Sequence, residues 1–339
     1  MKKIGLIGCG AVAGYGHLPA ILEVQDLKLH ALLDPNEDNL NRAKAQTGAP
    51  GAFTDAEAFF KSGIEAVTIT SPAPCHIDNV LAAARHKLPV LCEKPLAMTR
   101  SESETMIAAM KKAGVSLHTA FCYRFSPSAL KIRDWVKAGA IGKVRSLRLI
   151  YNWDCHGKYA IGPDGTRIIQ KRREGRMLEG GPMVDCGTHQ IDLALFWLGS
   201  DVVRYTGHGA WADDYEAPDH MWLHLDHANG AHTLVEISYS YYHTTPYKRN
   251  EFVYELIGTE GAIRYDRGAR SLTLADGSGL HTGEFHHEKD FTGMYAEWSK
   301  VLHGQPSDLL TSAEAGMRVA DLAREATNQA IALRVSGPG

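Results

Sequence analysis

The sequence predicts an α/β protein in which an N-terminal doubly wound parallel sheet precedes an α+β domain with a large, mostly antiparallel open sheet. Up to about residue 121, short apolar runs alternate with amphipathic stretches, which is typical of βαβ units. A glycine-rich segment follows the first apolar run directly. Beyond residue 124, apolar runs succeed one another with short turns between them, as in antiparallel sheets. We therefore predict two domains, residues 1–122 and residues 123–339.

The composition limits the classes of protein that fit this chain. A length of 339 residues is enough to bury two hydrophobic cores. The formal net charge of −3 creates no basic field that would attract nucleic acid or an anionic membrane. The six cysteines lie far apart and lack C-x-x-C spacing, so we expect reduced thiols. The apolar run after Lys2 and Lys3 is too short for a signal peptide, and no run approaches a membrane span, so we expect a cytoplasmic protein without a membrane or nucleic-acid partner.

The first domain is expected to contain five buried strands separated by helices. Each candidate strand is a short apolar run followed by turn residues or by a helical pattern. The strands are predicted at residues 3–7, 27–33, 66–70, 90–92 and 116–120. Helices are predicted at residues 55–61, 77–86 and 101–112, and the last of them is capped by Thr99 or Ser101.

The second domain is expected to begin with a helix at residues 127–137 and a long strand at residues 144–153. An irregular basic loop and a helix at about residues 183–198 follow. Six strands come next, at residues 202–211, 219–226, 232–240, 251–258, 261–266 and 271–275. One face of such a sheet has to be covered, so we expect helices at residues 291–303 and 312–333 to lie on it.

The segment Gly8-Cys9-Gly10-Ala11-Val12-Ala13-Gly14 fits the G-x-G-x-x-A pattern of dinucleotide-binding Rossmann domains. Gly8 permits the tight turn after the first strand, Gly10 lets a pyrophosphate approach the backbone, and Ala13 lets the helix pack closely. Asp34 ends the second strand, where a carboxylate binds the adenosine ribose hydroxyls and repels a 2′-phosphate. No arginine follows Asp34 directly. We therefore predict that the domain binds NAD in preference to NADP.

Two further segments carry groups that are suited to acid–base chemistry. Cys92-Glu93-Lys94-Pro95 follows a predicted strand, and open α/β sheets bind ligands at the carboxyl ends of their strands. A lysine there can face a nicotinamide ring. In the helix expected at about residues 183–198, Asp185 and His189 are four positions apart, which puts two side chains on one face of an α-helix. That pair can orient an alcohol.

The E-K-P after a Rossmann strand, together with G-G-x-x-x-D-x-G-x-H at residues 180–189, resembles the glucose-fructose oxidoreductase, inositol dehydrogenase and rhizopine catabolism (Gfo/Idh/MocA) family. The resemblance covers essentially the whole chain. Ser71-Pro72-Ala73-Pro74-Cys75-His76 is similar to the family's T-P-x-x-x-H loop, and Tyr123-Arg124-Phe125 is similar to its Y-R-F. The sequence departs from the family pattern at Ala73, where asparagine is common, and at Pro182, where a third glycine is common.

The resemblance implies hydride transfer between nicotinamide C4 and a secondary alcohol of a sugar, a cyclitol or a related polyhydroxylated compound. Lys94, Asp185 and His189 would line the reacting oxygen, and either His189 or Lys94 would remove the hydroxyl proton. A lysine, with a reference pKa of about 10.4, needs desolvation or the positive ring of the cofactor to act as a base. A histidine starts near ~6.5 and needs little change. We expect His189 to be the base and Lys94 to donate to the oxygen, while Asp185 orients or tunes both.

Other residues are expected to contact the cofactor or the substrate. The expected cofactor contacts are Gly8, Gly10, Ala11, Val12, Ala13, Asp34, Ser71, Pro72, His76, Glu93 and Lys94. The expected substrate contacts are Lys94, Tyr123, Arg124, Trp153, His156, Arg176, Asp185 and His189. Arg176 ends a basic loop, residues 167–176, which either binds an anionic substrate group or is a solvated face or subunit contact. We expect no metal, because the densest histidine cluster, at residues 286–288, consists of adjacent side chains that point apart.

Two other functions fit the same residues. The first is a redox-assisted glycosidase, known among relatives of this family, in which tightly held NAD transiently oxidises a ring hydroxyl. His156 or Tyr159 would then supply an additional acid or base. The second is a non-catalytic NAD-binding sensor, which the retention of Lys94, Asp185 and His189 argues against.

The resemblance also implies self-association. Family members bury one face of the C-terminal sheet against another subunit, so we expect a homodimer or a homotetramer. Val235, Ile237 and Tyr239 are expected to make that face partly apolar. The remaining partner is the small polyhydroxylated substrate.

Overall fold

The computed structural model describes residues 1–153, 159–161, 164, 166–169, 171–241 and 249–334. It divides into two compact units, neither of which is continuous in sequence. Unit 1 comprises Met1–Phe125 and Lys289–Ala320, and unit 2 comprises Ser126–Glu288 and Asp321–Gly339. A single boundary after residue 122 would assign residues 289–320 to the second domain, whereas they pack within unit 1. Within the described part of the chain, no helix is both long and apolar enough to cross a membrane.

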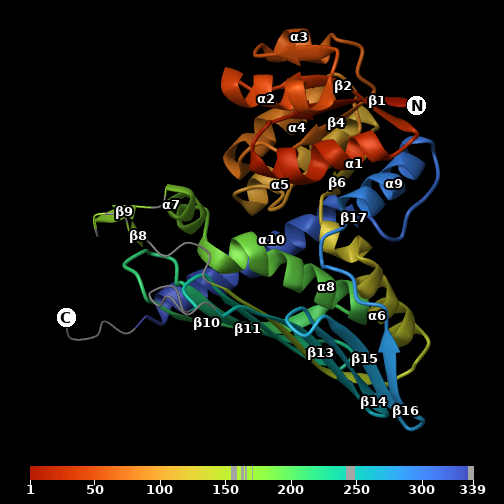
Figure 1. The fold of residues 1–339 in the computed structure, drawn as a ribbon, viewed down its shortest axis with the longest axis vertical. Coiled ribbons are helices and arrows are strands. Elements are labelled where there is room, and N and C mark those ends of the chain that lie inside the picture. The colour runs from red at the N-terminus through yellow and green to blue at the C-terminus, as the bar shows by residue number, and fades with distance from the viewer. Residues whose placement is uncertain (154–158, 162–163, 165, 170, 242–248, 335–339) are drawn as a thin grey trace. The chain divides into compact units, whose positions relative to one another are not determined.

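Unit 1 is built on a seven-stranded sheet, called sheet A (Figure 1). Its strand order is β17-β6-β5-β4-β1-β2-β3, and all neighbours are parallel except β17 and β6. The strands are β1 (Lys2–Ile7), β2 (Leu27–Leu33), β3 (Gly51–Phe53), β4 (Ala66–Ile69), β5 (Val90–Cys92), β6 (Leu117–Thr119) and β17 (Thr311–Ser312). The five predicted strands and the doubly wound parallel sheet are confirmed. The strand order reverses between β1 and β4, which is where such sheets open a crevice for a ligand.

The helices of unit 1 follow the local sequence signals. They are η1 (Ala13–His17, a π-helical turn), α1 (Leu18–Glu23), α2 (Glu37–Thr47), α3 (Ala56–Phe60), η2 (Ala73–Cys75), α4 (His76–Arg85), α5 (Arg100–Ala113), η3 (Cys122–Phe125) and α9 (Phe291–Leu302). Thr99 caps α5 in a reciprocal capping box with Glu102, as predicted. Helix α2 escaped prediction because it buries little: Leu40 and Ala43 are its buried residues.

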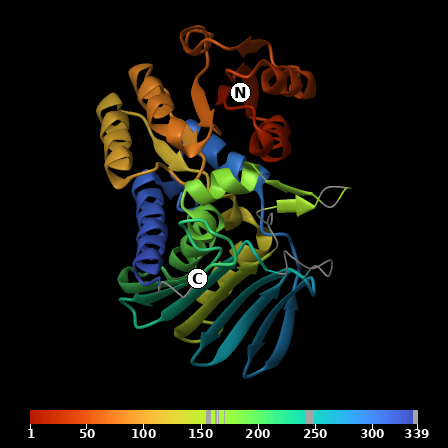
Figure 2. The same cartoon turned by 90° about the vertical axis from the view of Figure 1, so that its left-hand side faces the viewer.

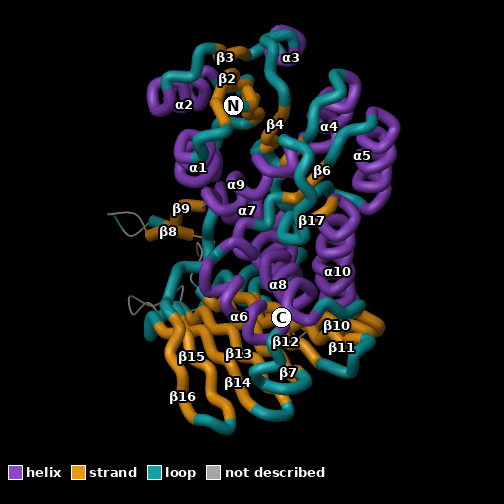
Figure 3. The backbone as a smooth tube through the Cα atoms, turned by 90° about the vertical axis from the view of Figure 1, so that its right-hand side faces the viewer, coloured by secondary structure: helices purple, strands orange, loops and turns teal. Residues whose placement is uncertain are grey.

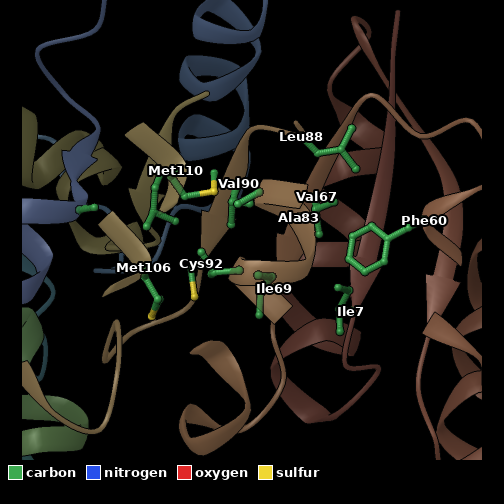
Figure 4. Packing of buried hydrophobic residues seen from close by; sticks show 14 of the residues in the cluster. Ile7, Phe60, Val67, Ile69, Ala83, Leu88, Val90, Cys92, Met106 and Met110 are labelled. Carbon is green, nitrogen blue, oxygen red and sulfur yellow. The ribbon is translucent and has the colours of Figure 1, made fainter. Parts of the chain in front are cut away.

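The core of unit 1 fixes where the strands end. Apolar side chains of β1, β4 and β5 pack against those of α4 and α5 (Figure 4). The labelled members of this cluster are Ile7, Phe60, Val67, Ile69, Ala83, Leu88, Val90, Cys92, Met106 and Met110. Because strands of a parallel sheet are buried on both faces, most of their residues are apolar, and the polar groups available to a ligand come mainly from the turns that follow them. Those turns carry the candidate cofactor residues.

Unit 2 contains an eight-stranded sheet, called sheet B, in the order β10-β11-β12-β7-β13-β14-β15-β16. The strands are β7 (Val144–Asn152), β10 (Val202–Ala210), β11 (His220–His227), β12 (His232–Ser238), β13 (Glu251–Gly258), β14 (Gly261–Asp266), β15 (Ser271–Asp276) and β16 (Gly279–Gly283). β12 and β7 are parallel and the other neighbours are antiparallel. The predicted mostly antiparallel open sheet is confirmed, and β16 is an additional edge strand.

Helices cover one face of sheet B (Figure 2). They are α6 (Pro127–Lys137), the π-helical turn η4 (Met183–Gly187), α8 (Thr188–Leu198) and the second half of α10 (Ala313–Ala332). A Cβ atom on Gly207 of β10 would lie 2.2 Å from the carbonyl oxygen of Ala326, so this glycine lets α10 approach the strand closely.

The basic loop expected to be irregular is partly regular. Residues Tyr159–Ile161 and Arg167–Ile169 form the antiparallel strands β8 and β9, drawn as a separate pair in Figure 3. Residues Lys171–Leu178 form helix α7. The expectation failed because an arginine-rich helix with few apolar residues lacks the apolar periodicity by which helices are recognised.

The expectation for Val235, Ile237 and Tyr239 was also wrong. All three side chains are fully buried within the chain itself; Val235 and Ile237 lie on the inner face of β12, and Tyr239 directly follows that strand. Side chains alternate between the two faces of a strand, so the opposite face of β12 carries residues such as Leu234 and Glu236, which are partly exposed. Alternation predicts two faces correctly but does not tell which one the helices cover. Self-association through sheet B stays a prediction, and it would use this opposite face.

Candidate active site

Turns at the carboxyl edge of sheet A carry most of the predicted cofactor residues. The adjacent strands β5, β4, β1 and β2 are parallel, so their carboxyl ends lie along one edge of the sheet. The turns after these strands contain Glu93 and Lys94, Ser71 and Pro72, Gly8 and Gly10, and Asp34, respectively. The topology therefore brings together, along one edge, residues that are up to 86 positions apart, from Gly8 to Lys94.

Gly8 occupies a backbone conformation that other residues avoid, because its φ is +92°. A Cβ atom there would lie 2.5 Å from the backbone nitrogen of Ser71. The hydroxyl of Thr70 donates to the Gly8 carbonyl at 2.5 Å and closes the turn. Gly8 therefore allows the turn after β1 to lie directly against the turn after β4.

Gly10, in contrast, faces open space. A Cβ atom on Gly10 would meet nothing within 4 Å. Its carbonyl accepts a hydrogen bond from the N–H of Gly14 at 3.1 Å, so helical structure begins here. Ala11 and Val12 follow at the start of the helix, and Ala13 is fully buried, as expected of the residue that lets the helix pack closely. A helix N-terminus with free space beside a glycine fits a pyrophosphate.

The carboxylate of Asp34 is held in place by two backbone donors. The N–H of Cys9 donates to Oδ2 at 2.7 Å and the N–H of Asn36 donates to Oδ1 at 2.8 Å. Burial and the nearby Asp34 carboxylate raise the pKa of the Cys9 thiol to about 12, so this thiol stays protonated at neutral pH. Nη2 of Arg42 donates to the Cys9 carbonyl at 3.3 Å. The result is a fixed negative charge beside the glycine-rich turn, which suits a ribose diol.

His76 connects two turns of this edge. Its Nε2 lies 2.9 Å from the Ser71 carbonyl oxygen, and its Nδ1 lies 3.1 Å from the carbonyl oxygens of both Pro95 and Leu96. The ring is buried, and this burial lowers the pKa of His76 below its usual value. The side chain therefore ties the turn after β4 to the turn after β5.

Glu93 is buried beside Lys94 and is bound on both of its oxygens. Oε1 lies 2.9 Å from Nε2 of His17, and Oε2 accepts the backbone N–H of Lys94 at 3.0 Å. Sequence reasoning missed His17. The available signal was a histidine inside the otherwise apolar helix that follows the glycine-rich segment.

In unit 2, Asp185 lies in the π-helical turn η4 rather than in an α-helix. Hydrogen bonds of a π-helix span five residues, so the α-helical spacing used to place Asp185 beside His189 does not apply. The hydroxyl of Tyr239 donates to Oδ2 of Asp185, and Nη1 of Arg176 lies 3.2 Å from Oδ1. The Asp185 carboxylate raises the pKa of Arg176 above its usual range. His189, in the first turn of α8, is 7 % exposed.

The fully buried Arg173 contacts both the backbone and the ring of Tyr239. Nη1 of Arg173 donates to the Tyr239 carbonyl at 3.1 Å, and its guanidinium lies 5.3 Å from the centre of the Tyr239 ring. Nη2 of Arg173 pairs with Asp219 and lies 3.4 Å from Asp213. Arg173 belongs to the basic segment considered for substrate binding, yet it is buried in the protein. Because Tyr239 was assigned to a subunit face, its contact with Asp185 was not foreseen.

The remaining predicted substrate residues take different positions. Tyr123 and Arg124 are buried in η3, and Nη1 of Arg124 donates to the Leu309 carbonyl at 3.4 Å. Trp153 stacks on Tyr151 with ring centres 5.1 Å apart. His156 lies outside the described residues. Within the described part of the chain, no three His, Cys, Asp or Glu side chains form a group that could hold a metal ion.

Both halves of the chain match family models. Residues 2–121 match a model described as "Oxidoreductase family, NAD-binding Rossmann fold", and residues 129–264 match the "GFO/IDH/MocA C-terminal domain". The chain belongs to the Gfo/Idh/MocA family. The resemblance read from E-K-P and from the segment around Asp185 is thereby confirmed.

Relatives of known name are similar over most of the chain. Myo-inositol 2-dehydrogenase of Thermotoga maritima is 30 % identical over 63 % of this chain and 60 % of that protein, which is less than two thirds of its length. The scyllo-inositol 2-dehydrogenase (NAD(+)) of Bacillus subtilis is 27 % identical over 77 % of this chain and 72 % of that protein. The crystal structure of a probable dehydrogenase from Thermotoga maritima has a TM-score of 0.78 and 26 % identity, covering 98 % of this chain and 97 % of that one.

The same substitution is expected to change different properties at the two glycines of the cofactor turn: stability at Gly8 and NAD binding at Gly10. Gly8→Ala is expected to destabilise the fold by about 1–3 kcal/mol, because its positive φ and the Ser71 backbone both oppose a side chain. Gly10→Ala is expected to leave the melting temperature unchanged and to weaken NAD binding, because its Cβ would occupy only the open space. Thermal unfolding and calorimetric NAD titration check both. Equal NAD affinity in Gly10→Ala and wild type would contradict the pyrophosphate site.

Removing the hydroxyl of Tyr239 tests the importance of its contact with Asp185. Tyr239→Phe is expected to lower kcat/KM by about tenfold or more, because a hydrogen bond to a charged group contributes about 1.5–3 kcal/mol. Tyr254→Phe is the matched control, because the Tyr254 hydroxyl is buried and has no hydrogen-bond partner among the described residues. Steady-state kinetics of the two variants give the comparison. Similar losses in both would show that the Asp185 contact is unimportant.

Proposed function

We propose that this chain is an NAD-dependent dehydrogenase that transfers a hydride between nicotinamide and a secondary hydroxyl of a neutral sugar or cyclitol. The observation that carries the proposal is the fixed Asp34 carboxylate beside the glycine-rich turn, on the same strand edge as Lys94. Similar proteins are named inositol dehydrogenases, and one of those names specifies NAD(+).

The residues of unit 1 fit a bound dinucleotide. The space at Gly10 and the helix N-terminus beside it would hold the pyrophosphate, and Asp34 would accept hydrogen bonds from the ribose diol. Both oxygens of Asp34 are already oriented by backbone N–H groups, so the carboxylate cannot turn away from a 2′-phosphate. This supports NAD over NADP. When bound, the nicotinamide ring supplies the acceptor or donor of the hydride.

The chain's own side chains have to move the proton that accompanies the hydride. We assign the base to His189, because an unperturbed imidazole has its pKa closer to neutral pH than a lysine has, and we assign Lys94 as the donor to the reacting oxygen. Asp185 would orient the substrate hydroxyl. Arg176 holds Asp185 through an ion pair and Tyr239 through a hydrogen bond, which leaves the carboxylate oriented to accept hydrogen bonds from substrate hydroxyls.

Charge balance around Asp185 supports a neutral substrate. Arg176 lies 3.2 Å from Asp185 and 3.3 Å from Glu179, so two carboxylates face one guanidinium. Arg173 is likewise paired with Asp213 and Asp219. Neither arginine has unbalanced positive charge for a sugar acid, and the carboxylates are suited to accept hydrogen bonds from hydroxyls. These two arginines thus support a neutral polyol over a uronate.

We further propose that the protein is cytoplasmic and forms a homodimer or homotetramer. The described cysteines, which exclude Cys155, are all free thiols, and this fits a reducing compartment. The opposite face of sheet B, with its partly exposed residues, offers a surface for a second copy.

The decisive experiment is NAD⁺ reduction by the purified protein with inositols, neutral aldoses, glycosides and uronic acids. Turnover is expected with a neutral polyol, and Lys94→Ala and His189→Ala are each expected to lower kcat/KM by roughly 10²–10⁴-fold, the usual contribution of acid–base catalysis. If an aglycone is released without net reduction of NAD⁺, the protein is a redox-assisted glycosidase and the dehydrogenase proposal is wrong. NAD binding without any turnover would favour the sensor.

The preference for NAD is tested by removing the Asp34 charge. In Asp34→Ser, kcat/KM for NADP relative to NAD is expected to rise at least about tenfold, because the repulsion of the 2′-phosphate is lost. Asp55→Ser removes the same charge from the cap of α3, where serine is also a good N-cap, and should leave the ratio unchanged. A wild-type protein that prefers NADP would refute the assignment.

A further inference from the structure

A chain of buried polar groups runs beneath the E-K-P turn. Thr68 Oγ1 lies 3.1 Å from the Tyr295 hydroxyl, which lies 2.8 Å from Nδ1 of His17. Nε2 of His17 lies 2.9 Å from Oε1 of Glu93, whose Oε2 accepts the backbone N–H of Lys94 at 3.0 Å. Four separate segments of unit 1, namely β4, α9, η1 and the turn after β5, are therefore joined through side chains.

The side chains of this series of hydrogen bonds lie in the interior of unit 1. His17 and Tyr295 are fully buried, and Glu93 is 7 % exposed. The His17 ring is packed edge-on against Phe291 and Tyr295, with ring centres 4.9 Å and 5.7 Å away. Buried polar groups are costly unless they are bonded, and a buried histidine and carboxylate are tolerated when each polar atom meets a partner. Both ring nitrogens of His17 and both oxygens of Glu93 meet this condition.

The position of Glu93 matters because of its neighbour in sequence. A carboxylate next to a lysine would otherwise be able to turn and pair with the lysine ammonium, which would hold the lysine proton more tightly. Here His17 at Oε1 and the Lys94 backbone N–H at Oε2 hold the carboxylate in one orientation. The same contacts fix the backbone at Lys94 from which the side chain starts.

We propose that His17 is a positioning residue for Lys94. It acts through Glu93, by holding the carboxylate in one orientation and so limiting how far it can turn toward the Lys94 ammonium. Tyr295, supplied by α9, sets the orientation of the His17 ring. The effect of this arrangement on catalysis rests on the proposed role of Lys94. Its effect on the surroundings of the Lys94 side chain is independent of that role.

Two amide substitutions separate the contacts of His17. Gln has an amide at the position of Nε2 and can still reach Glu93, whereas Asn has an amide near the position of Nδ1 and reaches only Tyr295. His17→Asn is expected to lower kcat about tenfold with KM for the substrate within about twofold, and to shift the pH profile of kcat upward. His17→Gln is expected to keep most of kcat and the wild-type pH profile.

An activity-independent readout distinguishes failure of this inference from failure of the proposed function. Lysines are converted to ¹³C-dimethyl-lysine, and the Lys94 signal is identified by its absence in Lys94→Arg. In His17→Asn the titration midpoint of Lys94 should rise relative to wild type, and in His17→Gln it should not, whether or not any substrate is turned over. Near-ultraviolet circular dichroism confirms that both variants are folded. Equal titration midpoints in the two variants, either both unchanged or both shifted, would overturn the positioning role.

Discussion

The common direction of four strands in sheet A is the constraint on which the candidate cofactor site depends. Only because β5, β4, β1 and β2 run in parallel do the turns that follow them lie on one edge. The turns are then locked to one another by a few atoms: the backbone approach between Gly8 and Ser71, and the imidazole of His76 between Ser71 and Pro95. Such preorganisation lowers the cost of ordering a loop when a ligand binds.

The two units each hold a buried or partly buried carboxylate through an aromatic side chain that forms a hydrogen bond with it. In unit 1, Glu93 is bonded by His17, and in unit 2, Asp185 is bonded by Tyr239. In both cases a π-helical turn carries one member of the pair, since η1 contains His17 and η4 contains Asp185. A π-helical turn widens the helix and displaces a side chain from its regular position, and such turns are frequent at functional sites. Each unit therefore departs from regular helix geometry at one residue of the pair that holds its carboxylate.

The elements that were predictable from sequence are those that apolar patterns define. Strands β2, β5, β13 and β14 were predicted with their observed bounds. Strand β3 is as short as β5, but it was missed because it is only partly buried and its residues, Gly-Ala-Phe, form no apolar run. The glycine and E-K-P turns were predictable because their chemistry is local. The contacts of His17 with Tyr295 and Glu93 were not, because they join positions 278 and 76 residues apart. Tyr239 was assigned to the wrong face because alternation alone does not show which face the helices cover.

The return of residues 289–320 to unit 1 has a consequence for synthesis on the ribosome. Strand β6 has no antiparallel neighbour until β17 has been made, and the buried side chain of His17 has no Tyr295 until the chain has reached residue 295. The unit that begins to leave the exit tunnel first therefore cannot complete its interior until nearly the whole chain has been made. All of residues 126–288 have to emerge in between, so the nascent N-terminal half waits with an open sheet edge and an incompletely bonded histidine while the other half is translated.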